Sequence, residues 1–234
     1  MIKKMQKTIC ALAVMTSFSL PALAADGVEI KVIGTIAPAA CTPTVAGGGV
    51  IDYGTIASNS LSSTDYTVLP VKSVDLNVVC SAPSKVALKS VSSRLNSVAG
   101  ASSENSIGAG YVPNVGTLSS QKVGLGLTTG GAKIGGYSVV VDEILVDGVS
   151  ADSVLFSDDN GIAWTKTTGL SFPLFNSLAP AHRLLTVSNG TVPESFTTLS
   201  TKVKVEGYLN KADEIDLNSP IDLDGLSTIE LVYM

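Results

Sequence analysis

Short stretches in which apolar and polar residues alternate recur along the whole chain, with turn residues between them. The alternation is clearest over residues 73–79, which lead into Cys80, and over residues 228–233 at the carboxyl end. A period of two places successive side chains on opposite faces of a β-strand. The pattern predicts strands over residues 28–36, 50–56, 66–71, 73–80, 85–91, 122–127, 137–146, 154–157, 162–165, 183–188, 200–209 and 228–233.

The spacing of these strands predicts the fold class. Many short strands separated by turn residues indicate an antiparallel β-sandwich or barrel and not a fold of alternating strands and helices. Residues 96–120 are rich in Ser, Gly and Asn and have no sustained periodicity, so they are expected to form a long surface excursion. Residues 150–180 are expected to be a second insertion. No repeat, linker or block of charge marks a domain boundary, which predicts a single domain.

The amino terminus has the features of a secretory signal peptide. Three lysines (Lys3, Lys4 and Lys7) precede an apolar stretch over residues 8–20, and Pro21 ends that stretch before Ala22-Leu23-Ala24. The predicted signal is residues 1–24, cleaved between Ala24 and Ala25, which leaves one domain over residues 25–234. The apolar stretch has about 13 residues, against roughly 20 needed to span a bilayer, so cleavage is favoured over a retained anchor.

Two cysteines remain after the signal is removed, because Cys10 lies inside it. Cys41 and Cys80 would meet an oxidising compartment, where a pair of thiols forms a disulfide by default. The bond would tie the first strand to a neighbouring strand, and closing a loop of about 40 residues stabilises a fold by roughly 4 kcal/mol. A metal site is the alternative, but the chain has a single histidine. No metal is predicted.

Composition narrows the classes of partner. The net charge of −5 becomes −8 when the three signal lysines are removed, and only 15% of residues are charged. An acidic exported chain disfavours nucleic acid and anionic membranes as partners. Abundant Gly, Ser, Thr and Val favour strands and turns over helices.

The motifs of common enzymes are absent or incomplete. The one histidine, His182, follows a proline turn, and no Gly-x-Ser-x-Gly sequence accompanies it, so no catalytic residue is predicted. Residues 124–126 and 130–133 are rich in glycine but lack the Gly-Lys-Ser/Thr ending of a phosphate-binding loop. A β-turn between Leu127 and Ile134 is expected instead.

Two further features were weighed as binding sites. Six oxygen-bearing residues cluster near the carboxyl end: Asp213, Glu214, Asp216, Asn218, Asp222 and Asp224. They would suit calcium, but Pro220 and Ile221 stand where ligands would be needed, so a solvated acidic loop is expected. Trp164 would suit stacking on a sugar, and burial in the sandwich core is the expected alternative.

The last strand carries more information about partners. Ile229, Leu231 and Tyr233 share one face by period-two alternation, and Thr228 and Glu230 lie on the other. A sandwich whose chain ends on this strand can have an unpaired edge or an open groove, which a strand from another chain can cover. The alternative is a self-contained sandwich with an interior last strand.

Several short motifs resemble chaperone–usher pilins and, more closely, the GltF-like family of fimbrial-like secreted proteins from Gram-negative bacteria. These motifs are Val32-Ile33-Gly34, Pro38-Ala39-Ala40-Cys41-Thr42-Pro43, Gly47-Gly48-Gly49, Asp52-Tyr53-Gly54, Cys80-Ser81-Ala82-Pro83 and Val232-Tyr233-Met234. They cover roughly the first 65 residues after the signal and the last ten.

The resemblance implies an immunoglobulin-like sandwich of the pilin type that lacks its final strand. A periplasmic chaperone would lend that strand until the amino-terminal extension of the next subunit replaces it. Ile229, Leu231 and Tyr233 would line the groove edge, and the Met234 carboxylate would dock on basic residues of the chaperone. The implied function is a fimbrial-like structural or adhesive subunit in the periplasm or at the cell surface, with a chaperone, an outer-membrane usher or other pilin subunits as partners.

The alternative function is a self-contained periplasmic or secreted binding module that does not polymerise. Only about seven residues, Ala25 to Lys31, would precede the first strand as an extension, and the length of the chain would allow it to supply the missing strand itself. Neither reading predicts an enzyme, a cofactor or a membrane span in the exported chain.

Overall fold

The computed structural model describes residues 28–35, 39–101, 121–176, 182–188 and 190–234. The chain divides into two compact units, Met1–Ala37 and Pro38–Met234, which are described separately. The predicted signal peptide and its cleavage point between Ala24 and Ala25 lie outside the described residues. No helix in the described ranges has the length and apolarity needed to cross a membrane.

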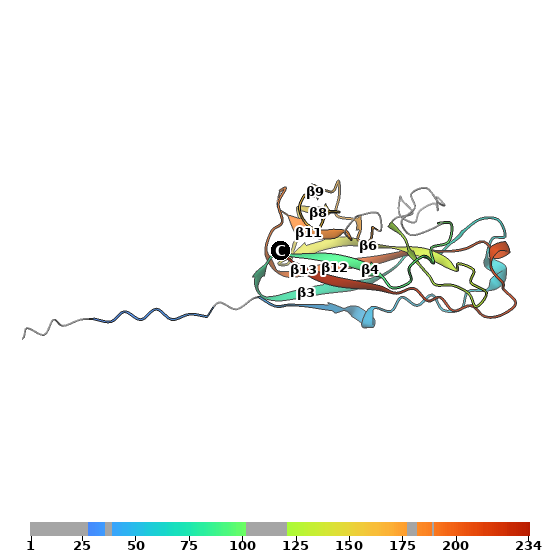
Figure 1. The fold of residues 1–234 in the computed structure, drawn as a ribbon, viewed down its shortest axis with the longest axis horizontal. Helices are drawn as coiled ribbons and strands as arrows, with labels where there is room; N and C mark the ends of the chain where they lie inside the picture. Colours follow the sequence, from blue (N-terminus) through green and yellow to red (C-terminus); the bar gives the residue numbers. More distant parts are fainter. Residues whose placement is uncertain (1–27, 36–38, 102–120, 177–181, 189) are drawn as a thin grey trace, which may run out of the picture. The chain divides into compact units, whose positions relative to one another are not determined.

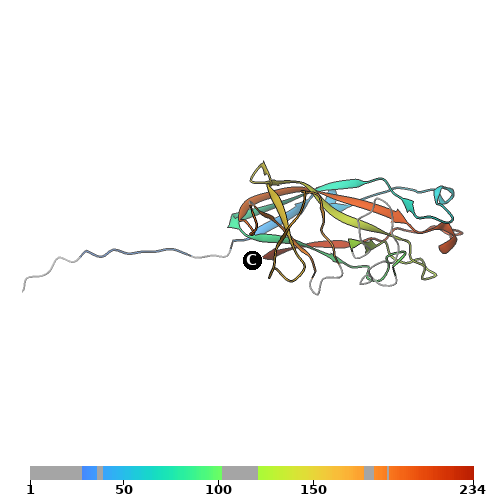
Figure 2. The same ribbon diagram turned by 90° about the horizontal axis from the view of Figure 1, so that it is seen from above.

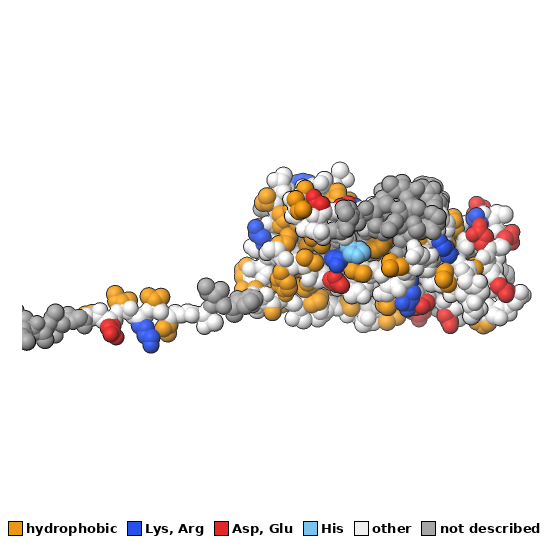
Figure 3. Space-filling view, in the orientation of Figure 1, with side chains coloured by type: hydrophobic (Ala, Val, Ile, Leu, Met, Phe, Trp, Pro, Cys, Tyr) orange, Lys and Arg blue, Asp and Glu red, His pale blue; other side chains and the backbone are white. Residues whose placement is uncertain are grey.

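Residues 28–35 of the first unit form no strand, so the strand predicted over residues 28–36 is wrong for its described part. Their apolar side chains are almost fully exposed, from 81% for Ile33 to 92% for Val32. Figure 3 shows apolar side chains together with an acidic and a basic one along this segment. Alternation gives a chain two distinct faces, but a β-strand also needs a neighbour for its backbone N–H and C=O groups.

The second unit is all-β and consists of two antiparallel sheets that do not close into a barrel, as the sequence predicts. The first sheet has the order β1 (Cys41–Val45), β3 (Lys72–Ser84), β12 (Phe196–Leu209), β6 (Gly135–Val146), β10 (Phe172–Pro173), with β2 (Thr67–Val68) on β12 and with β5 (Val123–Gly124) and β7 (Val149–Ser150) on β6. The second has the order β13 (Ser227–Tyr233), β4 (Val86–Ser92), β11 (Leu184–Ser188), β8 (Ser153–Ser157), β9 (Thr165–Lys166). Three short 3-10 turns complete the described elements: η1 (Ala46–Gly49), η2 (Ser58–Ser60) and η4 (Ala212–Glu214).

The core lies between the two sheets and is built from the inward-facing residues of their long strands. Val203 of β12 pairs with Val74 of β3 on one side and with Val141 of β6 on the other. Val78 of β3 and Val154 of β8 are fully buried in the same cluster. The long strands β3, β6, β12 and β13 lie roughly along one common axis in both ribbon views, with neighbours antiparallel (Figures 1 and 2).

Four other predicted strands differ from the observed ones, and one of these, over residues 122–127, is reduced to Val123–Gly124 with a single bridge at Leu127. Residues 50–56 are not hydrogen-bonded into either sheet, because the carboxylate of Asp52 accepts the backbone N–H of Gly54 at 2.7 Å and Gly54 has a φ of +64°. Such a local bond competes with strand pairing. The strand predicted over residues 66–71 is reduced to Thr67–Val68, and the one over residues 162–165 to Thr165–Lys166.

The two predicted insertions are also corrected in their described parts. Val98 and Ala99 open the first excursion, yet both are buried, and Ala99 donates its N–H to the carbonyl of Gly135 at 3.1 Å. Residues 102–120 lie outside the description. The second predicted insertion contributes β8, an inner strand of the second sheet. The turn between Leu127 and Ile134 is confirmed, since Leu127 pairs with Lys133 across it.

The strands β1 and β13 are edge strands of different sheets, and they meet at one end. The backbone N–H of Cys41 donates a hydrogen bond to the hydroxyl of Tyr233 at 2.7 Å. The carboxyl terminus, marked C in Figure 1, therefore lies beside the start of β1. The same flank of the sandwich carries both free edges.

Candidate functional site

An apolar groove of about 1350 Å³ follows this flank of the sandwich. One wall is formed by β1 and residues 50–57, and the other by residues 215–226 and the start of β13. The floor consists of core side chains from the first sheet, among them Tyr137, Val139, Val205 and Leu209. Most of these floor side chains are buried, whereas Val45, Val50 and Leu226 of the lining are exposed apolar residues that a covering strand would bury.

The wall side chains of β13 follow the predicted alternation. Ile229 and Leu231 are half-buried and pack on the core. Thr228 and Glu230 are exposed, and Glu230 forms an ion pair with Lys89 at 3.1 Å on the outer surface. Tyr233 is 52% exposed, so its ring is less buried than the alternation predicts.

The backbone N–H and C=O groups of β13 point alternately toward β4 and away from it. The register of β13 with β4 shows which residues point toward the free edge. Met234 donates its N–H to the carbonyl of Lys85, and Leu226 accepts the N–H of Ser93. In an antiparallel pair these alternate residues bond to the neighbour, here β4. The N–H and C=O groups of Ile229 and Leu231 therefore point away from β4, along the free edge.

The disulfide between Cys41 and Cys80 is confirmed, and it anchors the start of β1. The two residues are opposite one another in the β1–β3 pairing. Cys80 is buried in the core, and the bond holds the N–H of Cys41 where the Tyr233 hydroxyl accepts it. The disulfide therefore supports this contact between the edges of the two sheets.

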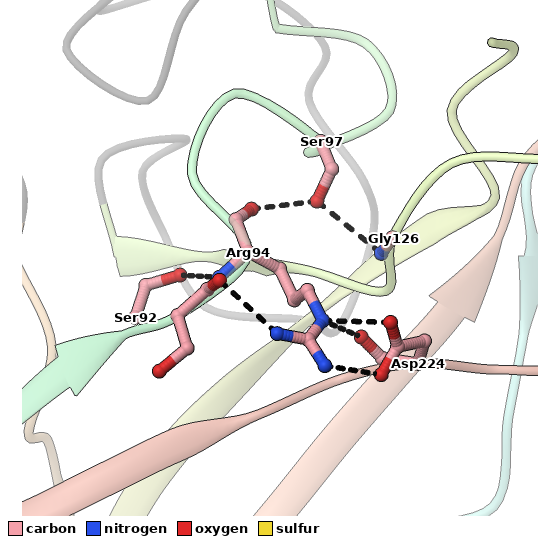
Figure 4. Close-up of polar contacts among 6 residues, drawn as sticks. Ser92, Arg94, Ser97, Gly126 and Asp224 are labelled. Carbon is pink, nitrogen blue, oxygen red and sulfur yellow. Dashed lines mark hydrogen bonds and ion pairs between the residues drawn. The ribbon is translucent and has the colours of Figure 1, made fainter.

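An ion pair holds the wall ahead of β13, and Figure 4 shows its geometry. The guanidinium of Arg94 donates to both carboxylate oxygens of Asp224 at 2.6 and 2.7 Å and to its carbonyl at 3.1 Å. Asp224 also donates its N–H to the carbonyl of Leu125. The hydrogen bond from Arg94 holds the pKa of the Asp224 carboxyl below its usual range. We call this arrangement the Arg94–Asp224 clasp.

A lysine holds the opposite wall. The ammonium of Lys72 donates to the carbonyl of Asp52 and lies 5.3 Å from the centre of the Tyr53 ring. The Tyr53 hydroxyl is buried and has no hydrogen-bond partner among the described residues. Burial raises the pKa of this hydroxyl.

The other residues considered from the sequence do not form a site. His182 is exposed, and Trp164 is half-buried beside Gly161 and outside the core cluster, which corrects the expected core position. The acidic residues near the carboxyl end are dispersed: Glu214 pairs with Lys211, and Asp224 with Arg94. In the described ranges, no three His, Cys, Asp or Glu side chains are close enough to hold a metal ion.

The most buried ion pair lies away from the groove and is structural. Arg183 is 5% exposed and binds both carboxylate oxygens of Asp158 at 2.7 and 2.9 Å. Its guanidinium lies 4.8 Å from the ring centre of Phe156 and 5.0 Å from that of Phe172. The pair is therefore held by further contacts, because Asn176 also donates to Asp158 and Arg183 also donates to the carbonyl of Pro173.

Sequence reasoning identified the β13 wall but missed the wall formed by residues 50–57. A motif was present, since Asp52-Tyr53-Gly54 is an Asx-type turn sequence inside an alternating stretch. The contacts of Asp52 and Tyr53 with Lys72, which hold this segment as a wall, involve a residue distant in sequence that no local pattern reveals.

Residues 30–138 match the family described as a protein of unknown function (DUF1120). The chain is also similar over nearly its whole length to two proteins of Escherichia coli strain K12. The uncharacterized protein YhcF is 29% identical over 233 residues, covering 93% of this chain and 94% of YhcF. Protein GltF is 26% identical over 246 residues, covering 97% of this chain and 96% of GltF. These matches support the resemblance to a GltF-like family. No solved structure matches the chain.

Proposed function

We propose that this chain, which carries a DUF1120 domain, is an exported fimbrial-like subunit whose sandwich is completed by a strand from another polypeptide. Its role would be structural or adhesive, in the periplasm or at the surface of a Gram-negative cell. A periplasmic chaperone would supply the strand first, and a second copy of the chain would supply it in the assembled fibre. An outer-membrane usher would be the exit route.

The observation that carries this proposal is the open groove between two sheet edges. Apolar side chains make up much of its lining, and backbone N–H and C=O groups along both walls, among them those of Ile229, have no partner among the described residues. An added strand satisfies such groups and buries such a surface at the same time. The Met234 carboxylate stands at the end of this edge, where a basic group of a chaperone would bind it.

The chain itself contains a segment with the chemistry of the missing strand. Val28, Ile30 and Val32 share one face, Glu29 and Lys31 lie on the other, and no sheet of the chain takes up these residues. Because the first strand begins at Cys41, the extension ahead of the sandwich is longer than the sequence pattern predicts. A longer extension supports donation of residues 28–33 to another copy.

The second candidate is the self-contained module, and one contact favours it. The hydrogen bond between Cys41 and Tyr233 already joins the two sheet edges without a partner. In that case the groove would bind a ligand and not a strand, and the chain would be a stable monomer.

Matched variants in the extension separate the two functions. The exported chain would be purified from the periplasm as wild type, Ile30→Lys and Glu29→Lys, and its mass would be measured by size exclusion with light scattering. We expect the wild type and Glu29→Lys to assemble or to co-purify with a periplasmic chaperone. Ile30→Lys should be a folded monomer, because its charge would have to enter the apolar groove.

Reversible unfolding of a wild-type monomer, with no effect of chaperone co-expression, would contradict the fimbrial-like function. The self-contained module would then be the function to pursue. Identical assembly of Ile30→Lys and Glu29→Lys would show that residues 28–33 are not the donated strand.

A further inference from the structure

Resting on the proposed function, we propose where the donated strand binds. Residues 28–34 of a second copy occupy the half of the groove between residues 50–56 and residues 221–225, which we call the distal half. The other half, between residues 43–45 of β1 and residues Ser227 and Ile229 of β13, is nearer the disulfide and is called the disulfide half. The backbone of the incoming strand pairs with residues 50–56 and not with β1.

The two walls of the distal half face one another across the same part of the floor. Gly207 pairs with Tyr137 in the first sheet. A β-carbon added to Gly207 would lie 3.3 Å from the hydroxyl of Tyr53, which belongs to one wall. A β-carbon added to Gly225, on the other wall, would lie 2.7 Å from Cε1 of Tyr137. Tyr53 and Gly225 are therefore at one level along the groove.

The disulfide half is obstructed along β1. Ser81 donates its N–H to the carbonyl of Ala40, so the antiparallel register turns the backbone of Cys41, Pro43 and Val45 toward the free edge. The N–H of Cys41 is already bonded to Tyr233. Proline has no N–H, so the middle of this edge cannot donate a bond to a partner strand. Only Val45 keeps a free donor there.

In the distal half, by contrast, the backbone groups of both walls are available to pair with an incoming strand. Apart from the N–H of Gly54 and the carbonyl of Asp52, the backbone groups of residues 50–56 have no hydrogen-bond partner among the described residues. The same holds for the backbone of residues 221–223. Ile51, Ile221 and Leu223 nevertheless turn their side chains toward the groove. These walls have the side-chain pattern of strands without a neighbouring strand.

Side chains hold both walls in place and leave their backbones available. Lys72 holds residues 50–56 through the carbonyl of Asp52, and the Arg94–Asp224 clasp holds residues 221–225 (Figure 4). Seven residues of β-strand span about 23 Å at roughly 3.3 Å per residue, so residues 28–34 match the length of residues 50–56. A preformed edge lowers the ordering cost of binding.

Hydrogen exchange with a bound peptide tests this position directly. The full exported chain carrying Ile30→Lys, whose own extension is disabled, would be mixed with a synthetic peptide of residues 25–36. Exchange of each segment would be followed by mass spectrometry, and a peptide carrying Ile30→Lys is the control. We expect slower exchange in residues 50–56 and 221–225, and unchanged exchange in β1.

The outcomes separate this proposal from the one it rests on. New protection in β1 with none in residues 50–56 would overturn the distal position and leave strand donation intact. Absence of any binding by the unmodified peptide would overturn the donated segment itself, and the distal position with it.

Two ion-pair variants give an independent test. Arg94→Gln breaks the clasp, and Lys89→Gln breaks the pair with Glu230 on the outer face of β13. We expect Arg94→Gln to weaken peptide binding roughly tenfold through loss of the preformed wall, and Lys89→Gln to change it less than about twofold. Equal affinities of both folded variants would contradict a role for the distal wall.

Discussion

Two tyrosine hydroxyls on this flank of the sandwich differ in hydrogen bonding, since one has a partner and the other has none among the described residues. The hydroxyl of Tyr233 accepts the N–H of Cys41 and joins two sheet edges. The hydroxyl of Tyr53 is buried without a partner among the described residues. A satisfied hydrogen bond contributes about 1 kcal/mol net, whereas a buried unsatisfied hydroxyl costs a similar amount or more.

Phenylalanine substitutions at these two positions should therefore change stability in opposite directions. Tyr233→Phe should lower the free energy of unfolding by about 1 kcal/mol. Tyr53→Phe should leave it unchanged or raise it by about 1 kcal/mol, because the ring and its contact with Lys72 are kept. Urea unfolding of the two variants measures both changes. A loss of stability in Tyr53→Phe as large as in Tyr233→Phe would show that the Tyr53 hydroxyl is bonded.

Ionisation of the Asp224 carboxyl makes the stability of the groove wall depend on pH. Its pKa is lowered, chiefly by the hydrogen bond from Arg94, so its contribution to stability is present above the ordinary aspartate pKa of about 4. That contribution is lost as the pH falls through the lowered pKa. The melting temperature of the wild type should exceed that of Asp224→Asn at pH 7, and the gap should close in acid. A gap that persists at low pH would contradict this role of the clasp.

At the scale of elements, both the side chains and the backbone hydrogen-bonding groups of β13 alternate in direction along the strand. Its side chains place Leu231 on the core and Thr228 in solvent, and its backbone turns Leu231 toward the free edge. One strand therefore contributes both to the core and to the groove wall. The residues 50–56 show the contrast, since they have the side-chain pattern but no paired edge.

Aspartate at the two faces of β13 should have very different effects. Leu231→Asp places a charge against the core and should cost several kcal/mol, enough to abolish accumulation of a domain of ordinary stability. Thr228→Asp should cost less than about 1 kcal/mol, because residue 228 is exposed. Periplasmic yield and thermal melting of the pair are the measurements. Similar behaviour of both variants would mean that β13 does not present these faces.

At the scale of the whole molecule, the disulfide fastens the first strand of the sandwich. Its loop spans 39 residues of sequence separation, and β1 has β3 as its one strand neighbour in the described sheets. Without the bond, β1 would depend on five residue pairs at a sheet edge. The hydrogen bond between Cys41 and Tyr233 would lose its support as well.

Replacing Cys41 and Cys80 together by alanine should lower the free energy of unfolding by roughly 4 kcal/mol, as expected for releasing a loop of this length. Urea unfolding compares the variant with the wild type. Alkylation and mass spectrometry of native protein provide the control, because two alkylated thiols in the wild type would show that the bond does not form in the cell.

Local patterns and chain-wide pairing explain which features the sequence determined. Alternation over residues 73–80 and 228–233, with two cysteines in an oxidising context, was enough to predict β3, β13 and the disulfide. These features depend on which side chains are apolar, and that information is local. The all-β class followed for the same reason.

Only the tertiary structure decided which alternating segments became strands. Residues 28–35 and 50–56 have the same period-two pattern as β13, yet neither is paired in a sheet. Pairing depends on a neighbour that is distant in sequence, as β4 is for β13. The groove exists because two such segments border one core, which no local pattern encodes.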